Sequence, residues 1–260
     1  MADETQRYSV FIEGETLDLC VPSEQAITDG WADWFNDAKT TRWLSQGIYP
    51  NHVEDQHGFL ESIRKRDRFA TLICGKGGGP LYGIISLSAI DWVARSAQIS
   101  LVVGEPLPGR QLIQLEAMAR VTEHAFQRMG LDRIWAGQAH PGLARWNQWL
   151  ELLGYYTDGV LRRGFVKGRE TVSNAVMICC LHEDYAAVRA RRGGQLWPGN
   201  DVMLRLIAGL PRQGFAHRLG EFLDRELPLY KAEIEALERR VLDEEGGGAD
   251  AAPKRRQAGS

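Results

Sequence analysis

The spacing of hydrophobic positions predicts a series of strands along the first 181 residues. In these stretches apolar and polar residues alternate with a period of two, or a short apolar run is bounded by turn residues. The predicted strands are 8–12 (continued by 17–20 after the Glu13-Gly14 turn), 69–74, 81–90, 97–103, 133–139, 160–166 and 172–181.

Helical spacing of apolar residues predicts helices between these strands, at 24–36, 53–65, 110–129 and 141–153. Ser23 can cap the first helix. Trp31, Trp34 and Phe35 lie three and four residues apart in it, so they share one helical face. The order β, helices, βββ, α, β, α, ββ indicates a mixed α/β fold with strands on both sides of a central helix.

The pattern changes after residue 183, where helical spacing continues without strands. Helices are predicted at 184–192, 201–210, 215–225 and 229–243. The last two carry apolar stripes and are joined at Pro228, so we expect them to pack as an antiparallel pair. The stripes are Phe215, Leu219, Phe222 and Leu223 on one helix and Tyr230, Ile234, Leu237 and Val241 on the next. We expect a domain at 1–185, a helical extension at 186–245 and a disordered tail at 246–260.

Composition and charge exclude several classes of protein. Of the 260 residues, 44% are hydrophobic and 25% are charged, which is ordinary for a globular protein. A net charge of −3 argues against a nucleic-acid coat or a polybasic membrane binder. The apolar runs are far shorter than the roughly 20 residues of a membrane span, so no membrane association is expected. The polar N-terminus and four cysteines without a disulfide pattern favour buried free thiols and a cytoplasmic location.

Two motifs that can bind phosphate or metal have simpler explanations. The glycine-rich stretch 75–80 leads through Pro80 into another strand, whereas a P-loop leads into a helix, so it is interpreted as a hairpin turn. His52, Asp55 and His57 have the spacing of metal ligands, but Pro50-Asn51 indicates the start of a helix. No metal site is predicted.

Several segments in a fixed order resemble the GNAT superfamily of acyl-CoA-dependent N-acyltransferases. They are 11–19, 34–37, 81–87, 98–106 leading to 115–118, Gly154-Tyr155 and 160–162, and together the resemblance covers about 8–185. The sequence is most similar to the branch of ribosomal-protein N-terminal and nucleotide-amino-sugar acetyltransferases. The resemblance implies a mixed, mostly antiparallel sheet of six or seven strands flanked by helices, with a splay after 97–103.

The resemblance also implies where an acyl-CoA co-substrate binds. In the family, backbone groups at the end of the fourth strand bond the pantetheine arm, which corresponds here to Val102, Val103 and Gly104. A loop entering the next helix wraps the pyrophosphate, because free N–H groups and the helix dipole favour an anion. The corresponding residues are Gly109, Arg110, Gln111, Leu112, Ile113 and Gln114.

This sequence departs from the family at three positions that matter for chemistry. Leu112 and Gln114 occupy loop positions where the family has glycine or alanine, although Arg110 supplies a forked donor for phosphate. Leu150 stands where the family has a tyrosine general acid, and Trp146 where one branch has serine. Gln98 replaces a carboxylate common on the fourth strand.

Candidate catalytic residues are therefore Asp91, at the end of a strand, and His140, at the start of a helix, where a near-neutral imidazole suits general base work. A capped turn is the alternative for Asp91, and a structural role for His140. Candidate acceptor-binding residues are Trp34, Asn36, Gln98 and Trp146. The alternatives are packing for the two tryptophans and a turn at the end of a helix for Asn36.

The implied function is transfer of an acyl group, acetyl in the simplest case, from CoA to a primary amine of a small molecule such as an amino sugar or amino acid derivative. Correct positioning of the two reactants would carry the reaction. No permanently bound cofactor is expected. The protein is expected to form a homodimer. The alternatives are a changed donor, such as an aminoacyl-tRNA or a carrier-protein ester, or a non-catalytic binding protein. Only the tRNA alternative involves nucleic acid.

Overall fold

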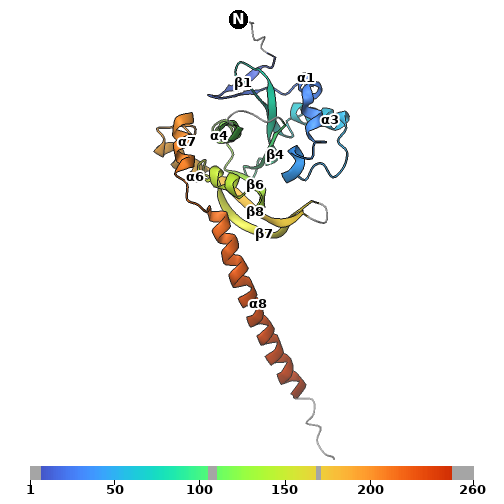
Figure 1. Ribbon diagram of the computed structural model, residues 1–260, viewed down its shortest axis with the longest axis vertical. Helices are drawn as coiled ribbons and strands as arrows, with labels where there is room; N and C mark the ends of the chain where they lie inside the picture. The colour runs from blue at the N-terminus through green and yellow to red at the C-terminus, as the bar shows by residue number, and fades with distance from the viewer. Residues whose placement is uncertain (1–6, 105–109, 168–170, 248–260) are drawn as a thin grey trace, which may run out of the picture. The chain divides into compact units, whose positions relative to one another are not determined.

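The fold is built on an eight-stranded sheet with the order β1-β2-β3-β4-β5-β6-β8-β7. Figure 1 labels β1, β4, β6, β8 and β7 of this sheet. The computed structural model describes residues 7–104, 110–167 and 171–247. The strands are β1 (Val10–Glu13), β2 (Asp18–Cys20), β3 (Phe69–Cys74), β4 (Leu81–Asp91), β5 (Ser96–Val103), β6 (Arg133–His140), β7 (Tyr156–Lys167) and β8 (Thr171–Leu181). All neighbours are antiparallel except β5 and β6. The predicted mixed sheet is confirmed, with one strand more because the chain reverses at 14–17 to pair β1 with β2.

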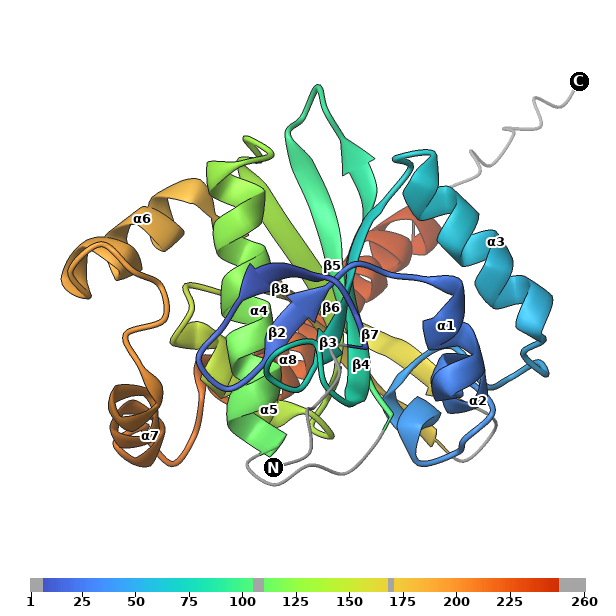
Figure 2. The same ribbon diagram turned by 90° about the horizontal axis from the view of Figure 1, so that it is seen from above.

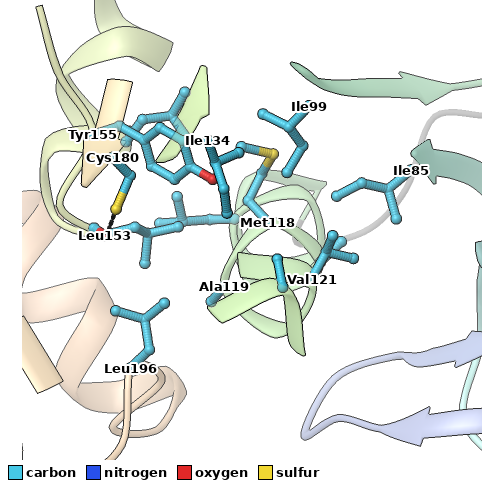
Figure 3. Packing of buried hydrophobic residues seen from close by; sticks show 14 of the residues in the cluster. Ile85, Ile99, Met118, Ala119, Val121, Ile134, Leu153, Tyr155, Cys180 and Leu196 are labelled. Carbon is cyan, nitrogen blue, oxygen red and sulfur yellow. Dashed lines mark hydrogen bonds between the residues drawn. The ribbon is translucent and has the colours of Figure 1, made fainter. Parts of the chain in front are cut away.

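Helices cover both faces of this sheet (Figure 2). On one face α4 (Arg110–Gln127) packs in the larger of two apolar clusters. Figure 3 shows Met118 and Val121 of this helix beside Ile85 and Ile99 of the sheet. On the other face α3 (Val53–Arg64) and the short helices before it form the second cluster, around Trp31.

The sheet opens between β5 and β6. The two strands are parallel and pair only where Ser96, Ala97 and Gln98 meet Arg133, Ile134 and Trp135. Beyond Gln98 and Trp135 they diverge, while β5 stays paired with β4 as far as Val103. The predicted splay is present, but it begins at Gln98, within β5, and not after the strand as expected.

The first helical segment differs from its prediction. Instead of one helix at 24–36, the chain forms α1 (Glu24–Ala26), the π-helical turn η1 (Ile27–Trp31) and α2 (Ala32–Trp34). Gly30 breaks the helix because its φ of 117° is left-handed. Ser23 makes no side-chain capping bond. Trp31, Trp34 and Phe35 are nevertheless buried, so they face the core as their spacing predicts.

The segment considered for metal binding begins a helix. The Asp55 carboxylate accepts the backbone N–H of His52 at 2.8 Å, which caps α3 at its first turn. The interpretation of 50–57 as a helix entry is confirmed.

The chain divides into two units, residues 1–217 and 218–260. After α5 (Ala144–Glu151) and the last strands, α6 (His182–Arg191) and α7 (Asn200–Ala208) belong to the first unit. Their buried residues Val188 and Met203 join the cluster around α4. The expected boundary at 185 thus differs from the boundary between units, which follows His217.

The last helix corrects the prediction of an antiparallel pair. Residues expected to form two helices form one, α8 (Phe215–Gly247), with Pro228 inside it. Proline removes one backbone hydrogen bond, but its fixed φ is compatible with a helix, so the helix continues past it. Of the expected disordered tail, Gly246 and Gly247 end α8, and 248–260 lies outside the described residues.

The four cysteines are buried and free, as expected. In the part of the chain that the structure describes, no helix combines the length and apolar character that crossing a bilayer requires.

Candidate active site

The backbone groups of alternate residues of β5 face the opening in the sheet. The N–H of Gly104 donates to the Tyr82 carbonyl at 3.0 Å, so the even-numbered residues of β5 bond β4. The Arg95 carbonyl accepts the N–H of Arg133 at 3.2 Å, so the odd-numbered residues bond β6. Past the last β6 pair, the backbone groups of Leu101 and Val103 therefore point into the wedge between the strands.

A cavity of about 350 Å³, here called the wedge cavity, lies in this opening. Its walls come from β5, β6, α4, α5 and the segment 39–44. The lining residues are Lys39, Thr40, Trp43, Leu44, Gln98, Ile99, Ser100, Leu101, Val102, Val103, Gln114, Met118, Ala136, Gly137, Gln138, Leu143, Trp146 and Trp149. Predicted donor-site residues Val102, Val103 and Gln114 are among them, as are the predicted acceptor residues Gln98 and Trp146.

The other predicted donor-site residues are not part of the described lining of the wedge cavity. Gly104 directly follows β5, and its N–H donates to the Tyr82 carbonyl of β4. Ile113 is buried in the core, and Leu112 packs against the same core. Gly109 lies outside the described residues, and Arg110 and Gln111 form the first turn of α4, where only the backbone is described.

A second cavity of about 670 Å³ lies on the α3 face of the sheet. The strand residues that line this face stand at alternate positions, because successive side chains of a strand point to opposite faces. The floor of this cavity carries two polar cross-strand pairs, Ser86 with Ser100 and Ser88 with Gln98. Asn51, Gln56, Phe59 and Arg68 contribute to its wall on the α3 side, and Leu161, Phe165 and Met177 on the β7–β8 side. The residues it shares with the wedge cavity are Trp43, Leu44, Gln98, Ser100, Val102, Gly137 and Gln138. The two cavities therefore meet where the sheet opens.

The segment 39–44, which borders both cavities, is bound by a lysine on the edge strand β7. It includes η2 (Thr40–Trp43). The Lys167 ammonium on β7 donates to the carbonyls of Thr41, of Leu44 at 3.3 Å and of Gln46 at 2.9 Å. Burial lowers the pKa of Lys167. Three accepting carbonyls compensate for that loss of solvation, so this contact fixes the segment beside the junction of the cavities.

Trp34 and Asn36 support this arrangement from outside the cavities. Trp34 is 6% exposed, and a Cβ on Gly104 would overlap its indole ring, so Gly104 permits the close packing that fixes the end of β5. Asn36 exchanges hydrogen bonds of 2.8 and 2.9 Å with the backbone of Asn51. It thereby positions Asn51, which lines the second cavity and also accepts a bond from Gln56 at 2.6 Å.

A comparison with known protein families agrees with this fold. Residues 21–141 match the family model described as the acetyltransferase (GNAT) domain. The match spans nearly half of the chain, so this part of the protein is similar to a GNAT acetyltransferase domain. No curated protein matches the chain significantly.

Solved acetyltransferases share the fold at low identity. A spermidine N-acetyltransferase from Vibrio cholerae, solved with CoA and spermine, is 15% identical, with a TM-score of 0.56 over 66% of this chain and 99% of its own. A GCN5-related N-acetyltransferase from Brucella melitensis is 19% identical, with a TM-score of 0.56 over 74% and 88%. The microcin C7 self-immunity acetyltransferase MccE, solved with acetyl-CoA and AMP, is 15% identical, with a TM-score of 0.53 over 65% and 93%. Together with the family match, this fold supports an N-acetyltransferase.

The two candidate catalytic residues, Asp91 and His140, do not line either cavity. Asp91 accepts the N–H groups of Val93 and Ala94, both at 2.8 Å, and so caps the turn between β4 and β5. His140 ends β6, is 7% exposed, and has its ring 6.0 Å from that of His217. Neither side chain is brought to the junction of the cavities.

The described lining of both cavities is almost uncharged. It contains no carboxylate, histidine, tyrosine or cysteine, and its only charged residues are Lys39 and Arg68. Leu150, where the family has its general acid, is fully buried in the core. Tyr155 is also buried; desolvation raises its pKa, and it bonds Thr122 at 2.6 Å outside the cavities. The site therefore offers amides, hydroxyls and backbone groups to a ligand.

Six residues of this site were not predicted from the sequence: Asn51, Gln56, Arg68, Ser86, Ser88 and Ser100. A signal for the serines was present, because they break the apolar pattern of two predicted strands at alternate positions. Their cross-strand pairing, which brings them together, depends on the register and is known only from the structure.

Proposed function

We propose that the protein transfers an acetyl group from a CoA thioester in the wedge cavity to the primary amine of a small molecule in the second cavity. One observation carries this proposal: the sheet opens at Gln98, and the unpaired backbone of Leu101 and Val103 faces a cavity that meets another on the opposite face. A thioester held at the junction is accessible to an amine from the other side.

The donor would be held mainly by backbone groups. The amides of a pantetheine arm can pair with the N–H and C=O groups of Leu101 and Val103, as a further strand would. The first-turn N–H groups of α4 are available for the pyrophosphate, with the helix dipole favouring its charge. In this proposal Arg110 adds phosphate contacts that compensate for Leu112 and Gln114 at the glycine-type positions.

Catalysis in this proposal rests on positioning. The neutral amine attacks the thioester carbon, a C–N bond forms and the C–S bond breaks, and the proton of the amine passes to the departing thiolate or to water. Orientation of two reactants supplies about 7–11 kcal/mol in favourable cases. The amide of Gln98 lies at the junction of the cavities and can accept a hydrogen bond from the attacking amine.

Coenzyme A is expected to raise the melting temperature of the full chain. A ligand at 100 times its Kd adds about 2.7 kcal/mol to stability, which is roughly 5–10 °C for a unit of this size. Differential scanning fluorimetry with CoA, and with adenosine as a control without the pantetheine arm, measures the shift. Thiol release from acetyl-CoA with an amine panel then measures turnover.

Each result of this experiment decides between the functions. A shift with turnover supports the acetyltransferase. A shift without turnover of any amine favours the non-catalytic alternative. The absence of both contradicts CoA as the donor and leaves the tRNA or carrier-protein ester.

We also propose that the protein is a homodimer paired through α8. Apolar residues recur on this helix at alternating spacings of four and three, which is the seam of a two-stranded coiled coil. They are Leu223, Leu227, Tyr230, Ile234, Leu237 and Val241. The last four are exposed by 39–61% of their surface, so this seam is uncovered within a single chain.

The charges beside the seam favour a parallel pair of identical helices. In parallel register Glu226 lies opposite the partner's Lys231, although Glu233 then lies opposite the partner's Glu238. An antiparallel pair with the same apolar layers would instead place Lys231 opposite the partner's Lys231 and Glu233 opposite the partner's Glu233. It would also place Asp224 of each chain opposite the partner's Glu238. The parallel pair therefore has fewer like-charge contacts.

A charge placed in the seam is expected to dissociate this dimer. The wild-type chain should have a mass near twice 29.1 kDa in light scattering, and Ile234→Lys a mass near 29.1 kDa. Glu235→Lys adds the same side chain one residue away, outside the seam, and should remain dimeric. A monomeric wild type, or a dimeric Ile234→Lys variant, contradicts pairing through α8.

A further inference from the structure

We propose that the acceptor is a primary amine that also carries an anionic group, a carboxylate or a phosphate, and that Arg68 binds this group. The inference rests on the proposed function and names the substrate class of the second cavity. It is carried by the charge of that cavity and by the geometry of Arg68.

Arg68 is the one charged residue among the described residues that line the second cavity. The rest of the polar lining consists of uncharged amides and hydroxyls: Ser45, Gln46, Asn51, Gln56, Ser86, Ser88, Gln98, Ser100 and Gln138. A polyamine acceptor would bring several positive charges beside Arg68, with no carboxylate in this lining to balance them. An anionic group on the acceptor would instead pair with the guanidinium.

The guanidinium is held in place but its donors are not fully used. Its central carbon lies 4.3 Å from the centre of the Phe59 ring, a cation–π contact that fixes the orientation of the group. Its Nε is buried and has no hydrogen-bond partner among the described residues. A buried donor without a partner costs stability, and an oxygen of a bound ligand would remove that cost.

Arg68 lies at a suitable distance from the wedge. It directly precedes β3, whose Phe69 pairs with Leu87 of β4, so Arg68 lies beside Ser88 on the α3 face. Ser88 pairs with Gln98 of β5, where the sheet opens. Two strand spacings separate the backbones of Arg68 and Gln98, about 10 Å. The length of the arginine side chain shortens this gap, so the amine and the anion of one small molecule can reach both residues.

Arg68 also borders a separate cavity of about 390 Å³, but the chemistry of that side is different. Its lining is mostly apolar and includes Phe11, Ile90, Trp92 and Met129. The side that combines Arg68 with Ser88 and Gln98 is the second cavity. We therefore assign the anion-binding role of Arg68 to that cavity.

The test compares amines with and without an anionic group on the same short carbon chain. With acetyl-CoA as donor, 4-aminobutyrate is measured against 4-aminobutanamide, phosphoethanolamine against ethanolamine, and putrescine serves as the dication. We expect kcat/KM at least tenfold higher for the anionic member of at least one pair. The pair with the larger ratio distinguishes a carboxylate acceptor from a phosphate acceptor.

Substitution at Arg68 separates binding of the anion from a structural role. Arg68→Gln should raise KM for the anionic amine at least tenfold, leave the neutral amine of the same pair unchanged, and preserve the shift in melting temperature with CoA. Arg68→Lys should restore part of the preference because the charge is kept. Arg66→Gln removes a neighbouring guanidinium that does not line the second cavity, and should leave the preference unchanged.

Several results would overturn the inference. Putrescine or the neutral amines reacting as well as the anionic ones would remove the charge preference. An equal loss for both members of a pair in Arg68→Gln would indicate a structural role. These outcomes leave the acetyltransferase intact, whereas the absence of both CoA binding and turnover contradicts the proposed function itself.

Discussion

Replacing Gly137 with leucine is expected to reduce acetyl transfer roughly a hundredfold while CoA still raises the melting temperature, since small misplacements of reactants cost rates of this order. Gly137 lines both cavities, and a Cβ built on it meets only the Met177 sulfur, at an ordinary contact distance of 3.5 Å. Trp135 and Ala139, which share its strand face, line the second cavity but not the wedge cavity. A leucine side chain would therefore extend to where the acceptor enters.

Gly159→Leu is the matched control for this substitution. Gly159 pairs with Met177 from β7, on the side opposite Gly137, and nothing lies within 4 Å of a Cβ built there. It lines neither of the two cavities. Steady-state kinetics should show loss of activity in Gly137→Leu alone. Full activity in Gly137→Leu, or equal losses in both variants, would contradict an acceptor path through the junction.

Replacing Glu116 with alanine is expected to lower the free energy of unfolding by about 3 kcal/mol, since each buried donor left unpaired costs about 1–3 kcal/mol. The Glu116 carboxylate on α4 is fully buried. It accepts the N–H of Glu15 at 2.5 Å and that of Thr16 at 2.8 Å, and it pairs with Arg120 at 3.0 Å. Alanine would leave these donors beside an apolar core.

Thermal or urea denaturation measures this loss, with Glu123→Ala as the control on the same helix. Glu123 has a side chain 20% exposed, and its contacts are a bond from Gln127 at 3.3 Å and a pair with Arg189 at 3.7 Å. Its removal should cost less than about 1 kcal/mol. Equal stability of the two variants would show that Glu116 does not fasten the turn between β1 and β2 to α4.

The parts of the fold that the sequence predicted are those fixed by local pattern. The period of two located the strands, and the resemblance located the splay between β5 and β6. The sequence-based predictions were wrong where a single residue determines whether a helix continues. Gly30 breaks a helix whose apolar spacing is continuous, and Pro228 does not break one where it was expected to.

The candidate site was predicted only where strand position was sufficient. Gln98 and Val103 lie at the wedge because they follow the end of the β5–β6 pairing. His140 was expected at the site because it ends the neighbouring strand, but its side chain is not part of the lining. Which face a residue occupies depends on register across strands. For the same reason the serine pairs and Arg68 could not be assembled from the sequence.

The lack of a proton-accepting side chain in the described lining has a consequence for which amines the protein can use. Because the described lining holds no histidine or carboxylate to remove a proton, the acceptor in the proposed reaction must arrive as the free base. At pH 7 a lysine-like amine, with a pKa near 10.4, is unprotonated in about one molecule in 2,500, and a peptide α-amino group in about one in ten. Basicity of the acceptor thus becomes a selection rule of its own: at equal fit, the weaker base is acetylated faster.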